Sequence, residues 1–359
     1  MNNSPQRAAK GFTRAFWVSN TVELFERMAY YAVFIVLTIY LSTILGFNDF
    51  EASMISGLFS GGLYLLPIFS GAYADKIGFR KSMIIAFSLL SIGYLGLGVL
   101  PTLLETAGLV NYGATTQFNG LPDSYTRWII VPVLFILMVG GSFIKSIISA
   151  SVAKETTEAT RARGYSIFYM MVNIGAFTGK TIIDPLRNVI GEQAYIYINY
   201  FSGAMTIIAL LAVILLYKST HTAGEGKSLR EISRGFMKII TNWRLLIIVQ
   251  ALAECFISPR YLEYFSLQAP KGEEGMYLGF SHLHSFLSSI FGFGLAGILL
   301  TKYCPDPTLF ETHAAWEAAS ANAHYIWYYF AAIGLIAAIA LLLFAKITES
   351  IDKKKKSSR

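Results

Sequence analysis

The sequence predicts an all-α polytopic membrane protein, with a bundle of six helices followed by about three further spans. Of the 359 residues, 54% are hydrophobic and only 14% are charged, whereas soluble domains carry about 25% charged residues. Apolar stretches of about 20 residues, the length that crosses a bilayer, recur along the chain, and basic residues cluster between them. This composition excludes a disordered chain, and two cysteines exclude a disulfide framework.

Nine apolar stretches are candidate spans, of which the first six are the clearest. They cover residues 17–45, 51–74, 80–100, 128–150, 165–184, 193–217, 244–264, 278–301 and 324–346. The weakest is 244–264, because it holds Glu254 mid-span and Pro259 near its end. We therefore expect a bundle over 1–217, a basic cytoplasmic linker over 218–243, a shortened transmembrane half over 244–347 and a basic cytoplasmic tail over 348–359.

The basic residues predict the orientation of the chain. They precede the first span, fall between spans two and three and between spans four and five, and follow span six. By the positive-inside rule the N-terminus is cytoplasmic, in a plasma membrane or a bacterial inner membrane. The cluster from Lys353 to Lys356 predicts a cytoplasmic tail as well, although nine crossings would place it outside. Nine crossings and a cytoplasmic tail exclude each other.

The first span carries three ionisable residues, Glu23, Glu26 and Arg27. Charged groups inside an apolar helix are costly and usually functional. Glu23 and Arg27 are four residues apart and so share a helix face, as do Glu26 and Tyr30. A buried carboxylate whose cationic partner can move away suits a proton carrier. The alternative is a salt bridge that only holds the bundle together.

Further polar residues mark the second to fifth spans. Between spans two and three lies a turn with Gly71, Asp75, Gly78 and Arg80, in which glycines permit a tight turn and close helix approach. Asp75 can pair with basic residues or cap a helix. Lys145 lies deep in the fourth span, too far from either end to reach water easily. The fifth span places an asparagine, residue 173, in the expected interior of the bundle.

Taken together, these residues resemble a known family. Glu23-x-x-Glu26-Arg27, Tyr64-x-x-Pro67, Lys145 and the run from Phe168 to Gly175 are similar to the proton-dependent oligopeptide transporters, and the Gly71 to Arg80 turn resembles the gating loop of the major facilitator superfamily. The resemblance covers residues 15–217 in order. A later stretch around Glu254 to Pro259, with Gly279, resembles the family's tenth helix and the loop into its eleventh.

The resemblance implies a proton-coupled symporter of small peptides or peptide-like zwitterions, with protons as the coupling ion and no other cofactor. It assigns proton coupling to Glu23, Glu26, Arg27 and Lys145. It assigns substrate binding to Arg27, Tyr30, Tyr64, Lys145, Asn173 and Glu254. It implies a gating loop with Gly71, Asp75, Gly78 and Arg80. Expected partners are the substrate and membrane lipids, without nucleic acid, and the sequence shows no metal cluster, nucleophile–base set or phosphate loop of an enzyme.

Two departures from the family leave alternatives open. Phe34 stands where the family usually has an arginine, and we expect helices seven to nine of the family to be absent, which would also resolve the topology conflict. The chain is then either a shortened symporter or a transport-inactive accessory subunit, with a protein partner or oligomer covering the shortened half. His282 and His284, near the start of a late span, suit a proton relay or a structural role; being two residues apart, they do not suit a shared metal site.

Overall fold

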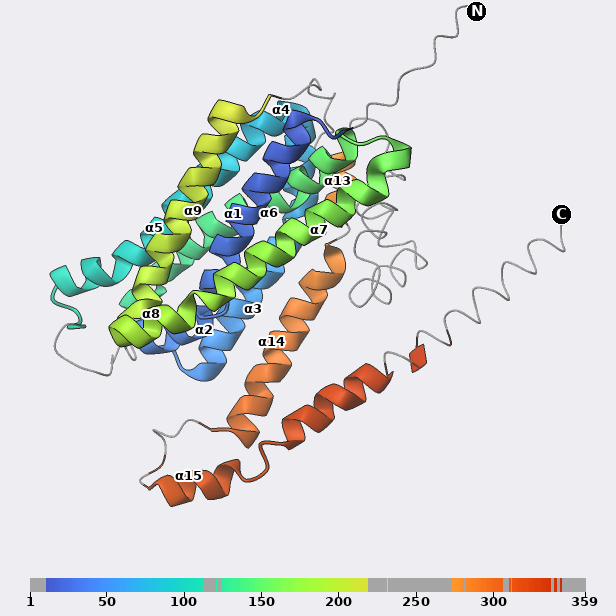
Figure 1. The fold of residues 1–359 in the computed structure, drawn as a ribbon. Coiled ribbons are helices and arrows are strands. Elements are labelled where there is room, and N and C mark those ends of the chain that lie inside the picture. Colours follow the sequence, from blue (N-terminus) through green and yellow to red (C-terminus); the bar gives the residue numbers. More distant parts are fainter. Residues whose placement is uncertain are drawn as a thin grey trace, which may run out of the picture.

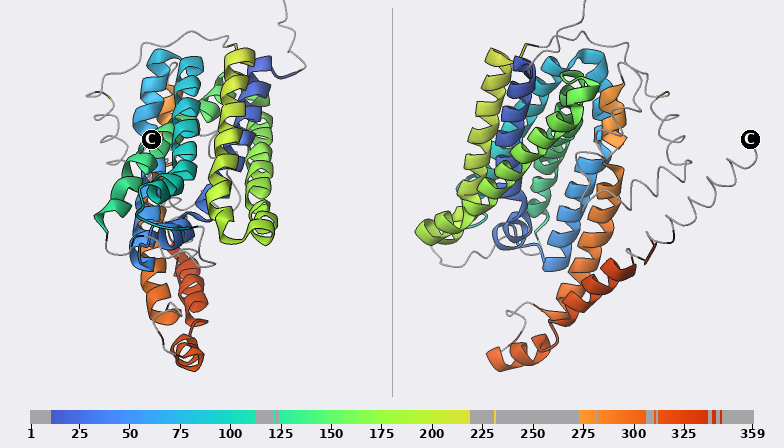
Figure 2. Two further views of the ribbon diagram at one scale, coloured as in Figure 1. Left: turned by 90° about the vertical axis from the view of Figure 1, so that its left-hand side faces the viewer. Right: turned by 45° about the vertical axis from the view of Figure 1, so that its right-hand side comes forward.

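The computed structural model describes residues 11–112, 121, 124–218, 231, 273–280, 282–305, 310, 312–336 and three positions up to 343. These form a bundle of long helices, with two later helices along one side (Figures 1 and 2). The elements are α1 (Arg14–Phe34), α2 (Leu37–Ile39), η1 (Tyr40–Ile44), α3 (Asp49–Leu65), α4 (Pro67–Ile77), α5 (Phe79–Thr106), η2 (Tyr125–Ile129), α6 (Ile130–Lys154), α7 (Glu158–Thr181), α8 (Ile183–Ile190), η3 (Gly191–Gln193), α9 (Ala194–Leu216), α13 (Glu274–Phe280), α14 (Leu283–Tyr303) and α15 (His313–Ser320).

Helix α1 packs closely on α7 and α9 and also contacts α6. Small residues allow the close approach. A Cβ added to Gly175 in α7 would lie 2.7 Å from the Leu24 carbonyl oxygen, and one on Gly179 would overlap that of Met28. Helix α5 packs on α6 and α9, and α3 and α4 pack on α6. Without a hydrophobic force between helices in lipid, such close van der Waals contact is what holds them together.

Three of the predicted spans are interrupted. The first bends by 44° between α1 and α2, where the Val36 amide bonds the Val33 carbonyl three residues back instead of four. The second is divided at Pro67, which begins α4 because proline suits the first position of a helix and lacks the amide that would continue α3. The predicted span over 278–301 is divided between Phe280, the end of α13, and Leu283, the start of α14.

Within the described residues, four stretches are long and apolar enough to cross a membrane. They are Asp49–Ile77, Phe79–Thr106, Tyr125–Lys154 and Glu158–Leu216, and the bent pair Arg14–Phe34 with Leu37–Ile44 is a fifth candidate. The last of the four contains two separate long helices, α7 and α9, which both pack on α1. The predicted span over 244–264 lies outside the described residues.

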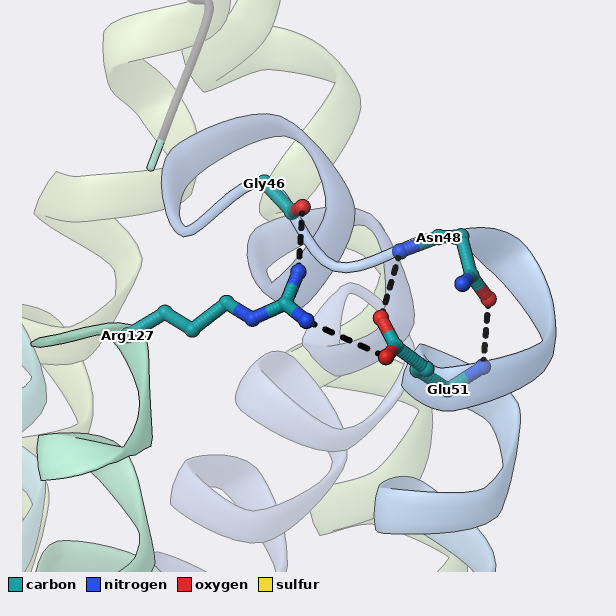
Figure 3. A network of polar contacts seen from close by, with 4 residues as sticks. All are labelled: Gly46, Asn48, Glu51 and Arg127. Atoms are coloured by element: carbon teal, nitrogen blue, oxygen red, sulfur yellow. Dashed lines mark hydrogen bonds and ion pairs between the residues drawn. The ribbon is translucent and has the colours of Figure 1, made fainter. Parts of the chain in front are cut away.

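The start of α3 is tied to the segment before α6 by a polar network (Figure 3). Asn48 and Glu51 form a reciprocal capping box, with hydrogen bonds of 2.9 and 3.1 Å. The Arg127 guanidinium donates to the Gly46 carbonyl and to Glu51, both at 3.1 Å, and lies 4.7 Å from the centre of the Phe47 ring. One arginine thus joins two turns that are 76 residues apart.

Candidate functional site

The charged cluster of α1 is buried in the bundle. The exposed fractions are 3% for Glu23, 1% for Glu26 and 5% for Arg27. The Arg27 Nε lies 3.1 Å from Glu23 Oε1, and the guanidinium also pairs with Glu26. Oε2 of Glu23 is buried and accepts no hydrogen bond from the described residues. One guanidinium therefore serves two carboxylates, and one carboxylate oxygen is left unsatisfied among these residues.

Lys145 of α6 lies in the same region. It is 8% exposed, and its ammonium nitrogen lies 5.2 Å from the ring centre of Tyr30 and 4.2 Å from that of Tyr64. Arg27 lies 5.2 Å from the same Tyr30 ring. Tyrosine faces attract cations through the ring quadrupole. Two cations thus share one phenol, and no described carboxylate lies within ion-pair distance of the lysine.

Residues of α14 complete this region from the later part of the chain. The His282 ring, directly before α14, lies 6.0 Å from the Tyr64 ring. Further along α14, Phe293 meets Phe34 edge-on at 5.9 Å, and Phe34 stacks on Tyr30 at 5.1 Å. At the position where the resemblance leads one to expect an arginine, the site therefore has an aromatic wall.

The turn between α4 and α5 touches the later part of the chain as well. Both carboxylate oxygens of Asp75 accept backbone amides of α13, from Gly275 at 3.3 Å and from Met276 at 3.2 Å. Gly71 faces the Gly275 backbone so closely that a Cβ would overlap it. Gly78 makes the turn with a φ of 87°, a conformation that favours glycine.

Arg80, the last residue of this motif, is directed elsewhere. Its guanidinium donates at 2.9 Å to the Ile214 carbonyl near the end of α9. It therefore ties the turn to the six-helix bundle, whereas Asp75 ties it to α13.

Asn173 does not lie in the bundle interior, and that expectation was wrong. It is exposed on α7, while Gly175 and Gly179 face α1. Two residues along a helix is a rotation of about 200°, so the face opposite the glycine contact carries Asn173. Glu254, the expected anionic pole, lies outside the described residues.

Sequence reasoning also missed the pairing of α13 and α14 with α4 and α3. One signal was present. Gly275 and Gly279 have the four-residue spacing of close helix contacts, and a Cβ on Gly279 would overlap the Pro67 carbonyl. That spacing indicates a close contact without indicating its partner, so the position of His282 beside Tyr64 could not be predicted.

Comparisons with known proteins agree with this arrangement. Residues 21–253 match the family model described as Major Facilitator Superfamily. Solute carrier family 15 member 1 of Mus musculus is 27% identical over 240 residues, 63% of this chain and 33% of the relative. Peptide transporter family 1 of Drosophila melanogaster is 26% identical over 225 residues, 59% of this chain and 28% of the relative. The match spans about a third of these relatives' length.

Solved structures show the same fold. A bacterial homologue of the human drug peptide transporters PepT1 and PepT2 superposes with a TM-score of 0.62, covering 95% of this chain and 99% of that chain at 14% identity. Tetrameric PepTSo2 gives a TM-score of 0.60, covering 93% of this chain and 99% of that chain, also at 14% identity. At such identities the likeness concerns the fold.

Proposed function

The chain belongs to the Major Facilitator Superfamily, and on that premise we propose that it carries small peptides or peptide-like zwitterions across a membrane together with protons. The observation that carries the proposal is the buried set of Glu23, Glu26, Arg27 and Lys145, in a chain that has Peptide transporter family 1 of Drosophila melanogaster among its curated relatives. Buried charges inside membrane helices mark substrate and ion pathways.

The proton-coupling role is supported by the way in which the buried charges are paired. Arg27 holds both carboxylates, while Lys145 lies against the Tyr30 and Tyr64 rings. The unsatisfied oxygen of Glu23 is a costly buried acceptor when the group is ionised. Protonation of that carboxyl removes most of this cost. A proton carried inward by such a group gains about 2.3 kcal/mol per 100 mV of membrane potential.

The substrate-binding role is supported by the two cations around Tyr30. Lys145 has no described carboxylate within ion-pair distance, so we assign the peptide carboxylate to it, with Arg27 beside it. We assign Glu254 to the amino end of the substrate. Phe34 and Phe293 give the adjacent wall an apolar surface, which suits a substrate side chain.

The proposed orientation, with a cytoplasmic N-terminus, is supported by the clustering of basic residues at one end of the bundle. Thr13, before α1, donates to Glu155, after α6, at 2.5 Å, and Arg80 bonds the end of α9 at 2.9 Å. The basic residues of these segments therefore lie at one end of the bundle. In Figure 1 this is the upper end, where α1 begins and where α4 is labelled. By the positive-inside rule, we assign this end of the bundle to the cytoplasmic side of the membrane.

The test is uptake of a labelled dipeptide into proteoliposomes, with and without an inward proton gradient. We expect Glu23→Gln and Glu26→Gln to lose gradient-driven uptake while retaining dipeptide exchange at equal pH, because binding survives when coupling is lost. Lys145→Ala should lose both. Matched controls are Glu158→Gln and Lys302→Ala, which change exposed residues.

The outcomes separate the two candidate functions. Driven uptake that is unchanged in the Glu23, Glu26 and Lys145 variants would contradict the mechanism. A folded wild-type protein that takes up no dipeptide would contradict transport itself and favour the transport-inactive accessory subunit. In that case a protein partner or oligomer would be sought on the later half of the chain.

A further inference from the structure

His282 occupies the interruption between α13 and α14. Its amide donates to the Gly279 carbonyl at 3.2 Å, and its carbonyl accepts the amides of Ser285 and Phe286 at 3.1 and 3.3 Å. The backbone of His282 is thus held by both helices. The side chain makes no capping hydrogen bond to α14, so the imidazole does not serve the function most often expected of a polar residue at the start of a helix.

Close packing on both sides of the interruption fixes where the imidazole lies. A Cβ on Gly279 would overlap the Pro67 carbonyl, and one on Gly61 would lie 3.2 Å from Ile290. About two helical turns from the interruptions, the hydroxyls of Ser60 and Ser289 are 2.8 Å apart and buried. The interruption in the later pair of helices is therefore pressed against the interruption between α3 and α4, with the imidazole beside Tyr64.

Tyr64 links this imidazole to the cationic pole of the site. Its ring centre lies 4.2 Å from the Lys145 ammonium and 6.0 Å from the His282 ring centre. Together these two distances limit the separation of the ammonium from the imidazole to about 10 Å, whereas an extended dipeptide spans about 7 Å. A hydrogen bond adds about 3 Å at an end. One dipeptide can therefore reach both groups.

We propose that His282 is a substrate-contacting residue that hydrogen-bonds the peptide backbone while Lys145 binds the carboxylate. This inference rests on the proposed function and adds to it a contact from the later half of the chain. A neutral imidazole offers one donor and one acceptor, which matches the carbonyl and amide of a peptide unit. The substrate class that satisfies both groups has a free carboxylate and at least one amide bond.

The rival explanation is that the ring of His282 only packs against Tyr64, and two substitutions separate these roles. His282→Phe keeps an aromatic ring and removes the hydrogen bonds, whereas His282→Gln keeps a donor and an acceptor and removes the ring. If the imidazole bonds the substrate, the phenylalanine variant should raise KM for a dipeptide about tenfold, with kcat within about twofold. The glutamine variant should recover most of the affinity.

The matched control is His313→Phe, because His313 is an exposed histidine at the start of α15. It should leave KM and kcat unchanged. A His282→Phe variant with the wild-type KM would overturn the proposal, as would a glutamine variant that binds more weakly than the phenylalanine variant. Because KM is compared with the wild-type protein, an absence of wild-type uptake counts against the proposed transport function and is distinguishable from a failure of His282.

A second measurement uses the wild-type protein and so does not depend on the folding of a variant. Diethyl pyrocarbonate modifies neutral histidines, and mass spectrometry of the digested protein gives the rate at each site. We expect a saturating dipeptide to slow modification at His282 and to leave His313 unchanged. Equal rates at His282 with and without the dipeptide, in a preparation that transports it, would overturn the proposal.

Discussion

Replacing Gly71 with alanine tests the closest approach between the first six helices and the later part of the chain. A Cβ at this position would overlap the Gly275 carbonyl and lie 3.1 Å from the Met276 backbone nitrogen. Both obstacles are backbone atoms, so the overlap is relieved only if α4 and α13 move apart. In a close-packed interior such movement loses contacts along the whole interface.

The expected magnitude follows from two opposing effects. Overpacking a well-packed interior costs about 1–3 kcal/mol, whereas alanine in place of glycine within a helix returns about 0.5–1 kcal/mol. We therefore expect Gly71→Ala to lower the free energy of unfolding by about 1–2 kcal/mol. The matched control is Gly292→Ala in α14, because a Cβ there meets no atom within 4 Å. That variant should be neutral or slightly more stable.

The assay is titration of the purified protein in mixed micelles with sodium dodecyl sulfate, followed by circular dichroism. Hydrogen exchange localises the effect, because the amides of α13 should exchange faster in Gly71→Ala while those of α7 keep their wild-type rates. If Gly71→Ala and Gly292→Ala unfold at the same detergent fraction, the close contact between α4 and α13 does not contribute as the structure indicates.

Three further predictions concern the polar contacts. A double-mutant cycle with Arg127→Gln and Glu51→Gln should give a coupling of about 0.5–1 kcal/mol, because the pair is partly buried; zero coupling would contradict the network in Figure 3. Asp75→Asn should lower stability by about 0.5–1 kcal/mol, since the charge at the start of α13 is lost, and Asp75→Ala should cost more. Tyr112→Phe loses a hydroxyl hydrogen bond of 2.6 Å to a backbone carbonyl, which is worth about 1 kcal/mol. Burial and the nearby Glu105 carboxylate raise the pKa of Tyr112 to about 12. The difference from Tyr112→Phe should therefore be equal at pH 7 and pH 9, should begin to fall above about pH 10, where the unfolded tyrosine ionises, and should be lost by about pH 12.

The spans of the first half could be predicted because hydropathy and length alone decide them. Their interruptions were predictable only in part. Pro67 carries a signal in its missing amide, whereas the bend after Phe34 contains neither proline nor glycine. That bend depends on how α1, α2 and their neighbours pack, which no local pattern records.

The candidate site, too, could be predicted from the sequence only in part. Helix geometry predicts that Glu23 and Arg27 share a face. In the structure, Arg27 Nε lies 3.1 Å from Glu23 Oε1. The prediction that Asn173 lies in the interior failed because a helix face is interior only if another helix covers it. Gly175 and Gly179 decide which face of α7 meets α1, and Asn173 lies on the other side.

The position of His282 depends on tertiary pairing over more than 200 residues. An interrupted membrane helix leaves backbone groups unpaired, and lipid cannot satisfy them. Placing two interruptions side by side, at Pro67 and at His282, keeps these groups inside protein. Lys145 and Tyr64 lie at the same place. Under the proposed function, these two interruptions also provide the polar surroundings of the substrate, and the proposed site lies where both helices are broken.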